Sequence, residues 1–448
     1  MSKGKVCLAY SGGLDTSVIL AWLVGQNYEV ICYIADVGQE ESDWASVEKK
    51  ALQIGATKLI VDDLKREFVE ELCWKAIQCN AVYESLYLLG TSLARPVIAR
   101  GQMRAAAREG CQFVSHGCVR PTTSLLVSEV NRWQTGKGND QVRFELTFAT
   151  INPEIRCITP WRLPEFYKRF EGRNDLLDYA AKKGIPVSST KAKPFSMDDN
   201  FAHCSYEAGV LEDPDVTPPE DMWTKTVSPL KAPDKPLDIT IFFEKGTPVK
   251  VFTPQQTATD SVELFGLLNR IGGEYGVGRI DIVENRFIGL KSRGCYDSPA
   301  MTILRLAHIS IEGLVLDGRV ISLRNAMSQQ WSELIYQGAY FSPERAFLQR
   351  ELFKHWEFRK TGDRELTLMT ASLDYSQQRV NGQVRLRLYK GGVYVLGRSS
   401  DGKLYSEEDA SMDSLTTFDP LDTTGFITIQ AIRLKKYGMQ MAEAGAKF

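Results

Sequence analysis

Near the start of the chain, the run Ser11-Gly12-Gly13-Leu14-Asp15-Thr16-Ser17 brings hydroxyl groups, two glycines and one carboxylate into a single turn. The glycines permit positive φ and close backbone approach, and the apolar residues 18–23 favour a helix directly afterwards. The unpaired amides at the start of such a helix would bind an anion. Because the Gly-Lys-Ser/Thr of kinase-type phosphate loops is missing from this turn, it suits a pyrophosphate leaving group. That predicts cleavage of ATP at its α-phosphate.

Elements that alternate between strand and helix would position this turn. Apolar, β-rich runs predict strands over 5–9, 29–35 and 58–61, and periodic runs predict helices over 48–54 and 66–79. Such alternation predicts an α/β fold with a doubly wound parallel sheet. Ligands of these sheets bind at the carboxyl ends of the strands.

One rim of the sheet should therefore gather three pieces of chain: residues 11–17, Ala35 and the turn at Gly117 that follows the apolar run 113–115. His116 lies in the same turn and could be catalytic. We favour a structural role for it, because the chemistry inferred below needs no histidine.

Beyond this part the composition changes, and segment 191–234 becomes rich in proline and polar residues. This indicates a linker or an ordered excursion between domains. The glycine-rich segment 272–278 follows a predicted helix and not a strand, so packing explains it better than phosphate binding. Regular elements are expected over 239–243 and 249–252 as strands, 261–271 as a helix, 384–396 as a hairpin, and 427–442 as a basic amphipathic helix.

Composition excludes several classes of protein. Lys and Arg number 54 against 56 Asp and Glu, a net charge of −2 that points to neither nucleic acid nor a membrane surface. No apolar run approaches the roughly 20 residues of a membrane span, and a strand beginning at Lys5 leaves no room for a signal peptide. The nine cysteines form no Cys-x-x-Cys, which indicates reduced thiols and a cytoplasmic protein.

The first motif resembles the ATP pyrophosphatase signature of adenylating synthetases. Further strings narrow the resemblance, and they occur in one order along the chain: 87–96, 135–145, 160–162, 172–175, 196–198, 205–209 and 278–286. Together they resemble the argininosuccinate synthase family from Lys5 to the C-terminal helix.

The resemblance implies a ligase that joins citrulline to aspartate through a citrullyl-adenylate and releases AMP and pyrophosphate, in arginine biosynthesis and the urea cycle. Mg²⁺ is expected on the ATP phosphates, with no protein metal site, and the family is expected to form a homotetramer. We therefore expect an ATP-binding domain over 1–186, an α+β synthetase domain over 187–420 and a C-terminal oligomerisation helix over 421–448.

Site residues follow from the same resemblance, residue by residue. The ATP site is Ala9, Tyr10, Ser11, Gly12, Gly13, Leu14, Asp15, Thr16, Ser17, Ala35 and Gly117, with Asp15 and Ser11 as catalytic residues. The citrulline site is Tyr87, Ser92, Asn139, Arg143, Ser196, Ser205, Glu284 and Tyr296. The aspartate site is Thr135, Asn139 and Asp140.

Two segments depart from the family pattern. Residues 119–134 separate Cys118 from Thr135, which are adjacent in the family's His-Gly-(Ala or Cys)-Thr-Gly-Lys-Gly-Asn-Asp string, and residues 350–371 interrupt a short connection between two helices. We hypothesise that both are retained introns translated in frame, since their codons can supply splice-site sequences. The rival explanation is a pair of genuine lineage-specific loops.

Two other functions remain open at this point. The segment 119–134 could disable catalysis, leaving a non-catalytic or regulatory paralogue that binds ATP without forming AMP. A different adenylating synthetase is the other alternative, although an amidotransferase would need a glutaminase nucleophile and the sequence has no Cys at position 2.

Overall fold

The computed structural model describes residues 2–40, 43–118, 139–186, 195–287, 289–348, 372–408, 410–411 and 421–443. The chain forms two units, one ending at Asp401 and one beginning at Gly402. The second unit contains helix α14 (Asp422–Glu443), which extends the predicted helix 427–442 at both ends.

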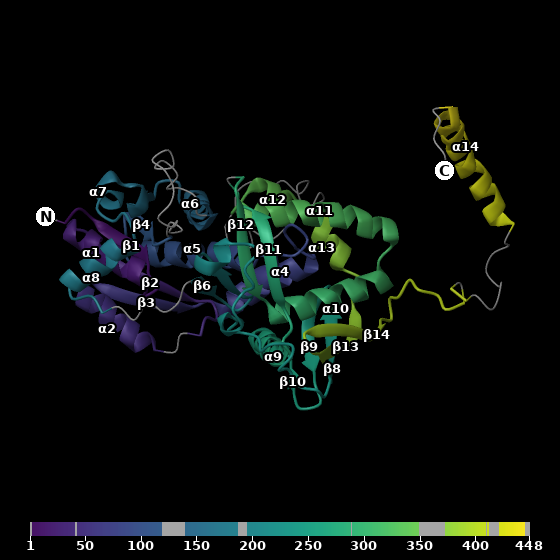
Figure 1. The fold of residues 1–448 in the computed structure, drawn as a ribbon, viewed down its shortest axis with the longest axis horizontal. Helices are drawn as coiled ribbons and strands as arrows, with labels where there is room; N and C mark the ends of the chain where they lie inside the picture. Colours follow the sequence, from purple (N-terminus) through teal and green to yellow (C-terminus); the bar gives the residue numbers. More distant parts are fainter. Residues whose placement is uncertain are drawn as a thin grey trace, which may run out of the picture. The chain divides into compact units, whose positions relative to one another are not determined.

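A five-stranded parallel sheet organises the N-terminal part of the first unit (Figure 1). Its order is β3-β2-β1-β4-β5, so the first strand of the chain lies at the centre. The three strands expected from the sequence are confirmed, with β2 and β3 each slightly longer than predicted. The bounds are β1 (Lys5–Ala9), β2 (Glu29–Asp36), β3 (Lys58–Asp63), β4 (Phe113–His116) and β5 (Arg156–Ile158).

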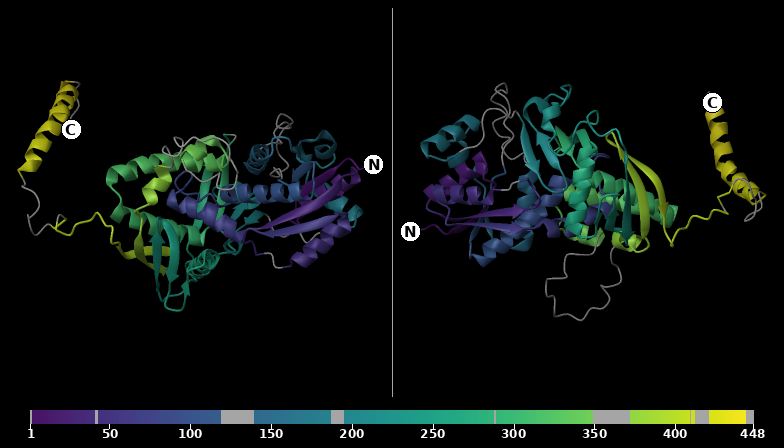
Figure 2. Two further views of the ribbon diagram at one scale, coloured as in Figure 1. Left: turned by 180° about the vertical axis from the view of Figure 1, so that it is seen from behind. Right: turned by 90° about the horizontal axis from the view of Figure 1, so that it is seen from below.

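Helices cover both faces of this sheet because successive side chains of a strand point to opposite sides (Figure 2). In β1, Val6 and Leu8 enter one hydrophobic cluster and Cys7 enters another. The first cluster is closed by α1 (Leu14–Gly25), α2 (Trp44–Ile54) and α8 (Arg173–Lys182). The second is closed by α5 (Gly90–Arg108) and α6 (Asn139–Ile151).

The predicted helix over 66–79 is helical throughout but changes its type in the middle. It consists of α3 (Lys65–Glu67), a π-helical stretch η1 (Phe68–Cys73) and α4 (Trp74–Gln78). The wider π turn allows Phe68, Val69, Leu72 and Cys73 all to be fully buried. Sequence periodicity detects the helix and its apolar residues but does not distinguish this wider turn.

Two antiparallel sheets form the rest of the unit, in the orders β10-β9-β8-β13-β14 and β11-β12-β7-β6. Their hydrophobic core is continuous with one face of the parallel sheet. The strands are β6 (Ser196–Asp199), β7 (Cys204–Glu207), β8 (Leu237–Glu244), β9 (Thr247–Phe252), β10 (Thr257–Ala258), β11 (Arg279–Asn285), β12 (Lys291–Asp297), β13 (Gly382–Tyr389) and β14 (Gly392–Ser399). The helices are α7 (Pro164–Tyr167), α9 (Ser261–Glu274), α10 (Pro299–Val315), α11 (Gly318–Tyr336), α12 (Pro343–Leu348) and α13 (Ser372–Gln377), with short 3₁₀ turns η3 (Pro160–Arg162), η4 (Gly209–Glu212) and η5 (Glu220–Met222).

The segment 191–234, expected to be a linker or an ordered excursion, is an ordered excursion over its described part. From residue 195 onward it supplies β6 and β7 to the four-stranded sheet, earlier than the first strand predicted in this half of the chain. The two strands have only four residues each. β6 is mostly polar, and the alternation of buried Cys204 and Tyr206 in β7 is too short to predict a strand.

The glycines of 272–278 serve packing. A Cβ on Gly273 would lie 2.2 Å from the carbonyl oxygen of Lys225, and one on Gly278 would lie 2.6 Å from the backbone of Ser298. Gly278 also has a φ of +104°, which favours glycine. The approach at Gly273 packs α9 against the main chain of Lys225, and the approach at Gly278 packs the start of β11 against the end of β12.

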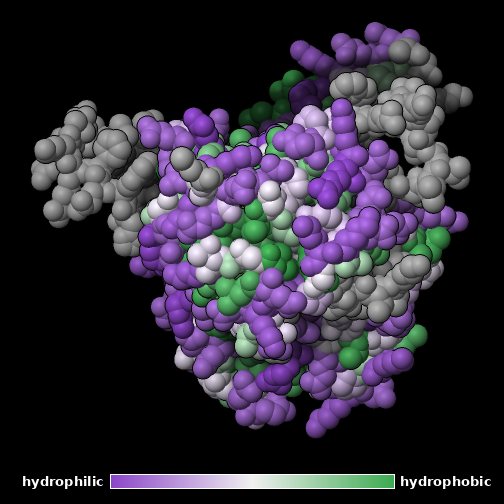
Figure 3. Space-filling view, turned by 90° about the vertical axis from the view of Figure 1, so that its left-hand side faces the viewer, coloured by the Kyte–Doolittle hydropathy of each residue, from purple (hydrophilic) through white to green (hydrophobic). Residues whose placement is uncertain are grey.

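The face of the molecule that carries the parallel sheet is mostly hydrophilic (Figure 3). Hydrophilic side chains cover most of that face, with one hydrophobic cluster near its centre (Figure 3). Within the described ranges, every helix is too short or too polar to span a bilayer.

A buried ion pair joins α10 to α11. Glu312 and Arg324 are each 2% exposed in their side chains and form a bidentate pair. The Glu312 carboxylate also accepts hydrogen bonds from Asn80 Nδ2 at 2.5 Å and Gln377 Nε2 at 2.9 Å. The carboxylate therefore ties together four separate parts of the chain.

Glu312→Ala is expected to lower the free energy of unfolding by about 3–5 kcal/mol, because Arg324 would remain buried without its counter-charge. Denaturant unfolding followed by circular dichroism measures the change. Glu70→Ala is the matched control, since Glu70 forms an exposed i,i+4 pair with Arg66 and should cost less than about 0.5 kcal/mol. Equal losses in the two variants would contradict the expectation.

Candidate active site

The carboxyl ends of the parallel strands bring the predicted ATP-binding residues to one rim, as expected. The turn formed by residues 11–17, called the motif turn below, follows β1. Ala35 lies near the end of β2, and Gly117 follows β4. A Cβ on Gly117 would lie 2.2 Å from Cγ2 of Thr16. The first and fourth strands therefore end in loops that touch, and this position requires glycine.

The motif turn leaves a helix N-terminus open. Gly12 has a φ of +73°, and Gly13 is the N-cap of α1 without a side-chain hydrogen bond. The Ser11 hydroxyl lies 3.1 Å from that of Thr16 and accepts a hydrogen bond from the Gly13 amide at 3.4 Å. The Tyr10 and Ser17 hydroxyls are 3.1 Å apart. The turn thus combines backbone amides and hydroxyl donors at the positive end of a helix, which suits a phosphate.

A lysine from another helix reaches this turn. Lys50 of α2 donates a hydrogen bond from Nζ to the Gly12 carbonyl at 2.6 Å, and burial lowers its pKa. The motif itself contains no lysine, so sequence reasoning missed this cation. Its only sequence signal is its place on the helix after β2, which packs against α1.

Next to the rim lies a cavity of about 310 Å³. Nine of the predicted residues line it: Asp15, Tyr87, Asn139, Asp140, Arg143, Ser196, Ser205, Glu284 and Tyr296. Ser92 does not line it and is fully buried in α5. Apart from Asp15, the ATP-site residues lie on the rim and outside this cavity. Thr135 lies outside the described residues.

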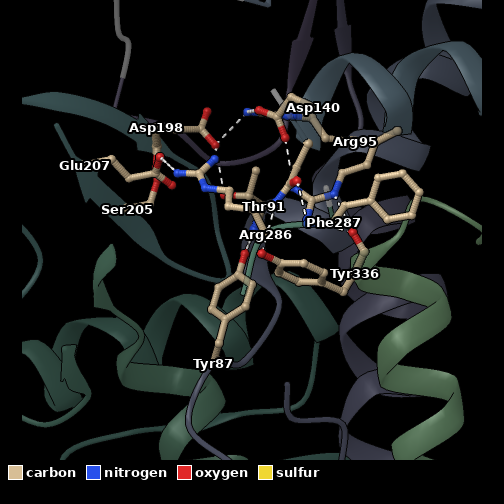
Figure 4. A network of polar contacts seen from close by, with 12 residues as sticks. Tyr87, Thr91, Arg95, Asp140, Asp198, Ser205, Glu207, Arg286, Phe287 and Tyr336 are labelled. Carbon is tan, nitrogen blue, oxygen red and sulfur yellow. Dashed lines mark hydrogen bonds and ion pairs between the residues drawn. The ribbon is translucent and has the colours of Figure 1, made fainter. Parts of the chain in front are cut away.

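Arg95 links two carboxylates at this cavity (Figure 4). Its Nη2 lies 2.7 Å from Asp140 Oδ2 and 2.8 Å from Asp198 Oδ2. Asp198 also accepts from the Thr91 hydroxyl at 3.2 Å. Burial alone would raise the pKa of Asp140, but Arg95 and Arg143 hold it well below its usual range. Asp140 is therefore a carboxylate at neutral pH.

Arg143 and Glu284 meet at Tyr336, the last residue of α11. Arg143 donates to the Tyr336 carbonyl from Nε at 3.0 Å and from Nη2 at 2.8 Å, and to Asp140 Oδ1 from Nη1 at 2.9 Å. The Tyr336 hydroxyl donates to Glu284 Oε1 at 2.8 Å. Burial raises the pKa of Glu284 to about 7, so its charge changes near neutral pH.

Aromatic side chains form another wall of the cavity. Tyr296 stacks on Tyr87 with ring centroids 4.4 Å apart and on His203 at 5.4 Å. Burial lowers the pKa of His203 to about 3, so this imidazole is neutral. Glu207 and Arg286 form an ion pair beside this wall. The cavity therefore offers flat apolar surfaces between fixed charges, which fits a zwitterionic ligand.

His116 proves to be the last residue of β4 and not a turn residue. It is 1% exposed and packs against the rings of Phe144 and Phe148. Its Nε2 lies 3.6 Å from Glu145 Oε1. This packing explains its place in the chain without a catalytic role.

Sequence reasoning missed several residues that line or build the cavity. Arg95, Asp198, Glu207 and Arg286 all lie inside the strings that carried the family resemblance, so a signal for them existed. Tyr336 lies outside every one of those strings. Its position in α11 gives no local sign that it reaches the cavity.

Comparison with known proteins agrees with this geometry. The family model for the "Arginosuccinate synthase N-terminal HUP domain" matches residues 5–186. The model for the "Arginosuccinate synthase C-terminal domain" matches in two pieces, 195–370 and 360–437, which overlap inside the second departing segment.

Curated relatives match over nearly the whole chain. An argininosuccinate synthase from Saccharomyces cerevisiae is 54% identical over 446 residues, covering 98% of this chain and 97% of that protein. One from Schizosaccharomyces pombe is 51% identical over 433 residues, covering 96% of each. One from Homo sapiens is 48% identical over 448 residues, covering 100% of this chain and 100% of that protein. The chain belongs to the argininosuccinate synthase family.

Proposed function

We propose that the rim and the adjoining cavity form one active site, in which ATP lies at the rim and citrulline and aspartate lie in the cavity. The citrulline–aspartate ligase activity of the family uses ATP, and this proposal assigns its steps to residues of this chain. The observation that carries it is the convergence of nine predicted residues on one cavity beside the open N-terminus of α1.

The ATP half rests on the turn after β1. The amides and hydroxyls of residues 11–17 hold the β- and γ-phosphates as the pyrophosphate leaving group. Asp15 lies in the first turn of α1 and lines the cavity, between the two halves of the site. Lys50 adds a positive charge beside the same turn.

Two steps then follow without a side-chain nucleophile. The ureido oxygen of citrulline attacks the α-phosphorus, the bond to the β-phosphate oxygen breaks, and pyrophosphate leaves. The aspartate amine next attacks the ureido carbon and loses a proton. The bond between that carbon and the former ureido oxygen breaks, and AMP leaves with the oxygen and the bonding electrons. Cys118 lines the cavity, but burial raises the pKa of its thiol well above the ordinary value. Catalysis is therefore assigned to positioning and to charge stabilisation.

Citrulline is assigned to the residues around Tyr87, Arg143 and Glu284, and aspartate to those around Asp140. Mg²⁺ usually keeps several waters and binds through one or two carboxylates together with substrate phosphates. The part of the chain that the structure describes holds no group of three or more His, Cys, Asp or Glu side chains that could hold a metal. Asp15 fits the role of a single carboxylate ligand to an ion that ATP carries, and that ion would neutralise phosphate charge.

AMP formation tests the proposal. It should require both citrulline and aspartate for turnover, and citrulline labelled with ¹⁸O in the ureido group should transfer that oxygen to AMP. AMP without the label would overturn the adenylate route. ATP binding without any citrulline-dependent AMP would instead support the non-catalytic paralogue.

Arg143→Ala is expected to raise the citrulline KM by at least about tenfold and the ATP KM far less. The change removes hydrogen bonds of a charged group, each worth about 1.5–3 kcal/mol. The aspartate KM should also rise, because Asp140 loses one of its two arginine partners. Initial-rate kinetics with each substrate varied in turn measures the three values.

Arg162→Ala serves as the control for Arg143→Ala. Arg162 also pairs with a carboxylate of α6, Glu145, but it does not line the cavity. Its loss should leave all three KM values within about twofold. Equal rises in the citrulline and ATP KM of Arg143→Ala would contradict the assigned role.

We further propose a homotetramer in the cytoplasm, with the ATP-binding, synthetase and C-terminal parts divided at 186–187 and 420–421. The solvent-exposed apolar side chains of α14, including Phe426, Ile429 and Ile432, support an oligomer arm. All nine cysteines are free thiols, which supports a reducing compartment.

A further inference from the structure

Tyr336 lies where two predicted binding residues meet, although no motif includes it. Its side chain is 1% exposed and lines the cavity. Its ring stacks on that of Tyr83 with centroids 3.7 Å apart and planes at 7°. The stack fixes the ring, so the direction of the hydroxyl is set by the fold.

The Tyr336 hydroxyl joins Asn139 to Glu284. It accepts a hydrogen bond from Asn139 Nδ2 at 3.0 Å and donates one to Glu284 Oε1 at 2.8 Å. Asn139 Oδ1 in turn accepts from the Phe287 amide at 3.2 Å. Both ends of the Asn139 amide are thereby oriented.

Glu284 keeps one oxygen for a ligand. The residue is 3% exposed, and its Oε2 is buried without a hydrogen-bond partner in the described part of the chain. An unpaired buried carboxylate oxygen is costly. Glu284 lines the cavity, so an N–H group of a bound substrate would satisfy this oxygen.

The main-chain carbonyl of Tyr336 binds a third residue, Arg143. The carbonyl accepts both Nε and Nη2 of Arg143, and it lies at the C-terminal end of α11, where carbonyl groups carry partial negative charge. The same residue thus holds Arg143 through its main chain and Asn139 and Glu284 through its side chain.

We propose that Tyr336 is a positioning residue for citrulline, whose hydroxyl holds Glu284 and Asn139 in the orientation that binds this substrate. The inference rests on the proposed citrulline site. Tyr336 acts through Glu284 and Asn139 and takes no part in bond formation.

Several groups set the charge of Glu284, and they predict the direction of a pH effect. The carboxyl faces Glu207, Arg286, Arg143 and the rings of Tyr83, Tyr87, Tyr296 and Tyr336. Burial raises its pKa, and the Tyr336 hydrogen bond lowers it because that bond favours the carboxylate. Removing the hydroxyl should therefore raise the pKa of Glu284 further.

Tyr336→Phe tests the inference because it keeps the ring and the main-chain carbonyl and removes only the hydroxyl. We expect the citrulline KM to rise about tenfold and the ATP KM to stay within about twofold. The acid limb of kcat/KM for citrulline should move to higher pH by about one unit, because activity needs the Glu284 carboxylate. Tyr83→Phe is the matched control, because it removes the hydroxyl of the other stacked ring, which donates to the Asn285 carbonyl at 2.8 Å and not to Glu284.

Glu284→Gln separates this inference from the proposed site. This substitution should raise the citrulline KM and abolish the acid limb of the kcat/KM profile for citrulline. Adding Tyr336→Phe to Glu284→Gln should then cause no further change in the pH profile. If Glu284→Gln and Arg143→Ala leave the citrulline KM unchanged, the site assignment fails. If Glu284→Gln and Arg143→Ala raise the citrulline KM, but Tyr336→Phe has the same KM and pH profile as Tyr83→Phe, the citrulline site is supported. The role of Tyr336 is then overturned.

Discussion

Asp15→Ala is expected to lower turnover by about 100- to 1,000-fold, the range seen when a preorganised group at a developing charge is removed. Ser11→Ala should have an effect of the same order. Asp15 lies in the first turn of α1, between the rim and the cavity. Ser11 orders the turn through Thr16 and the Gly13 amide. In the proposed site, both residues therefore lie where the phosphate chain and the attacking oxygen would meet.

The fold should survive both substitutions. Ser11 is exposed, and Asp15 contributes no apolar surface to the core. An acidic residue in the first helical turn contributes typically about 0.3–1 kcal/mol through the helix dipole, so thermal unfolding should change little. AMP release with saturating substrates measures turnover.

Asp260→Ala controls for the loss of an acid at a helix start. Asp260 caps α9 by accepting from the amides of Val262 and Glu263, and it does not line the cavity. It should cost about 1 kcal/mol of stability and leave turnover unchanged. Near-normal turnover in folded Asp15→Ala would refute the catalytic assignment.

Deleting 119–134 is expected to raise aspartate-dependent turnover by about 100-fold, because small misplacements of reacting groups can cost that much. The segment lies outside the described residues, but its flanks lie together: Gln141 Nε2 donates to the Cys118 carbonyl at 3.3 Å. Residues 135–138 alone can reach about 13 Å. The shortened chain can therefore rejoin Cys118 to α6 and restore the family string.

The deletion should leave stability nearly unchanged, since closure of a loop costs only about 0.6 kcal/mol per doubling of its length. A variant in which 119–134 is replaced by Gly and Ser at equal length distinguishes the effect of loop length from that of loop sequence. If length is the cause of the impairment, this variant should stay impaired. Equal aspartate-dependent rates with and without the segment would show that it is harmless. Genomic and transcript sequences test the retained-intron hypothesis. Transcripts that all carry both segments would refute it.

Local patterns were enough to predict the parallel sheet and its rim, because buried strands, glycine turns and helix starts each have a short sequence signature. They were not enough for residues whose role depends on contacts between distant segments. Lys50 reaches Gly12 from the next helix, and Tyr336 reaches Glu284 from a helix 52 positions further along the chain. Neither has a neighbour in sequence that marks it. The short strands β6 and β7 were missed for a related reason. β7 forms by pairing with β12 and β6 by pairing with β7, and neither has a long apolar alternation of its own.

The central place of β1 has a consequence for how the chain folds during synthesis. Its strand pairs with β2 on one side and with β4 on the other, and the Lys5 amide donates to the Gln112 side chain, 107 positions later. β1 leaves the ribosome before the other strands of its sheet, and it therefore keeps an open edge until β4 has been made. Pairing over such a separation slows folding, and an unpaired apolar edge invites association with other chains. The strand that leads into the proposed phosphate-binding turn is thus made before the other strands of its sheet, yet its pairing is completed only when β4 arrives.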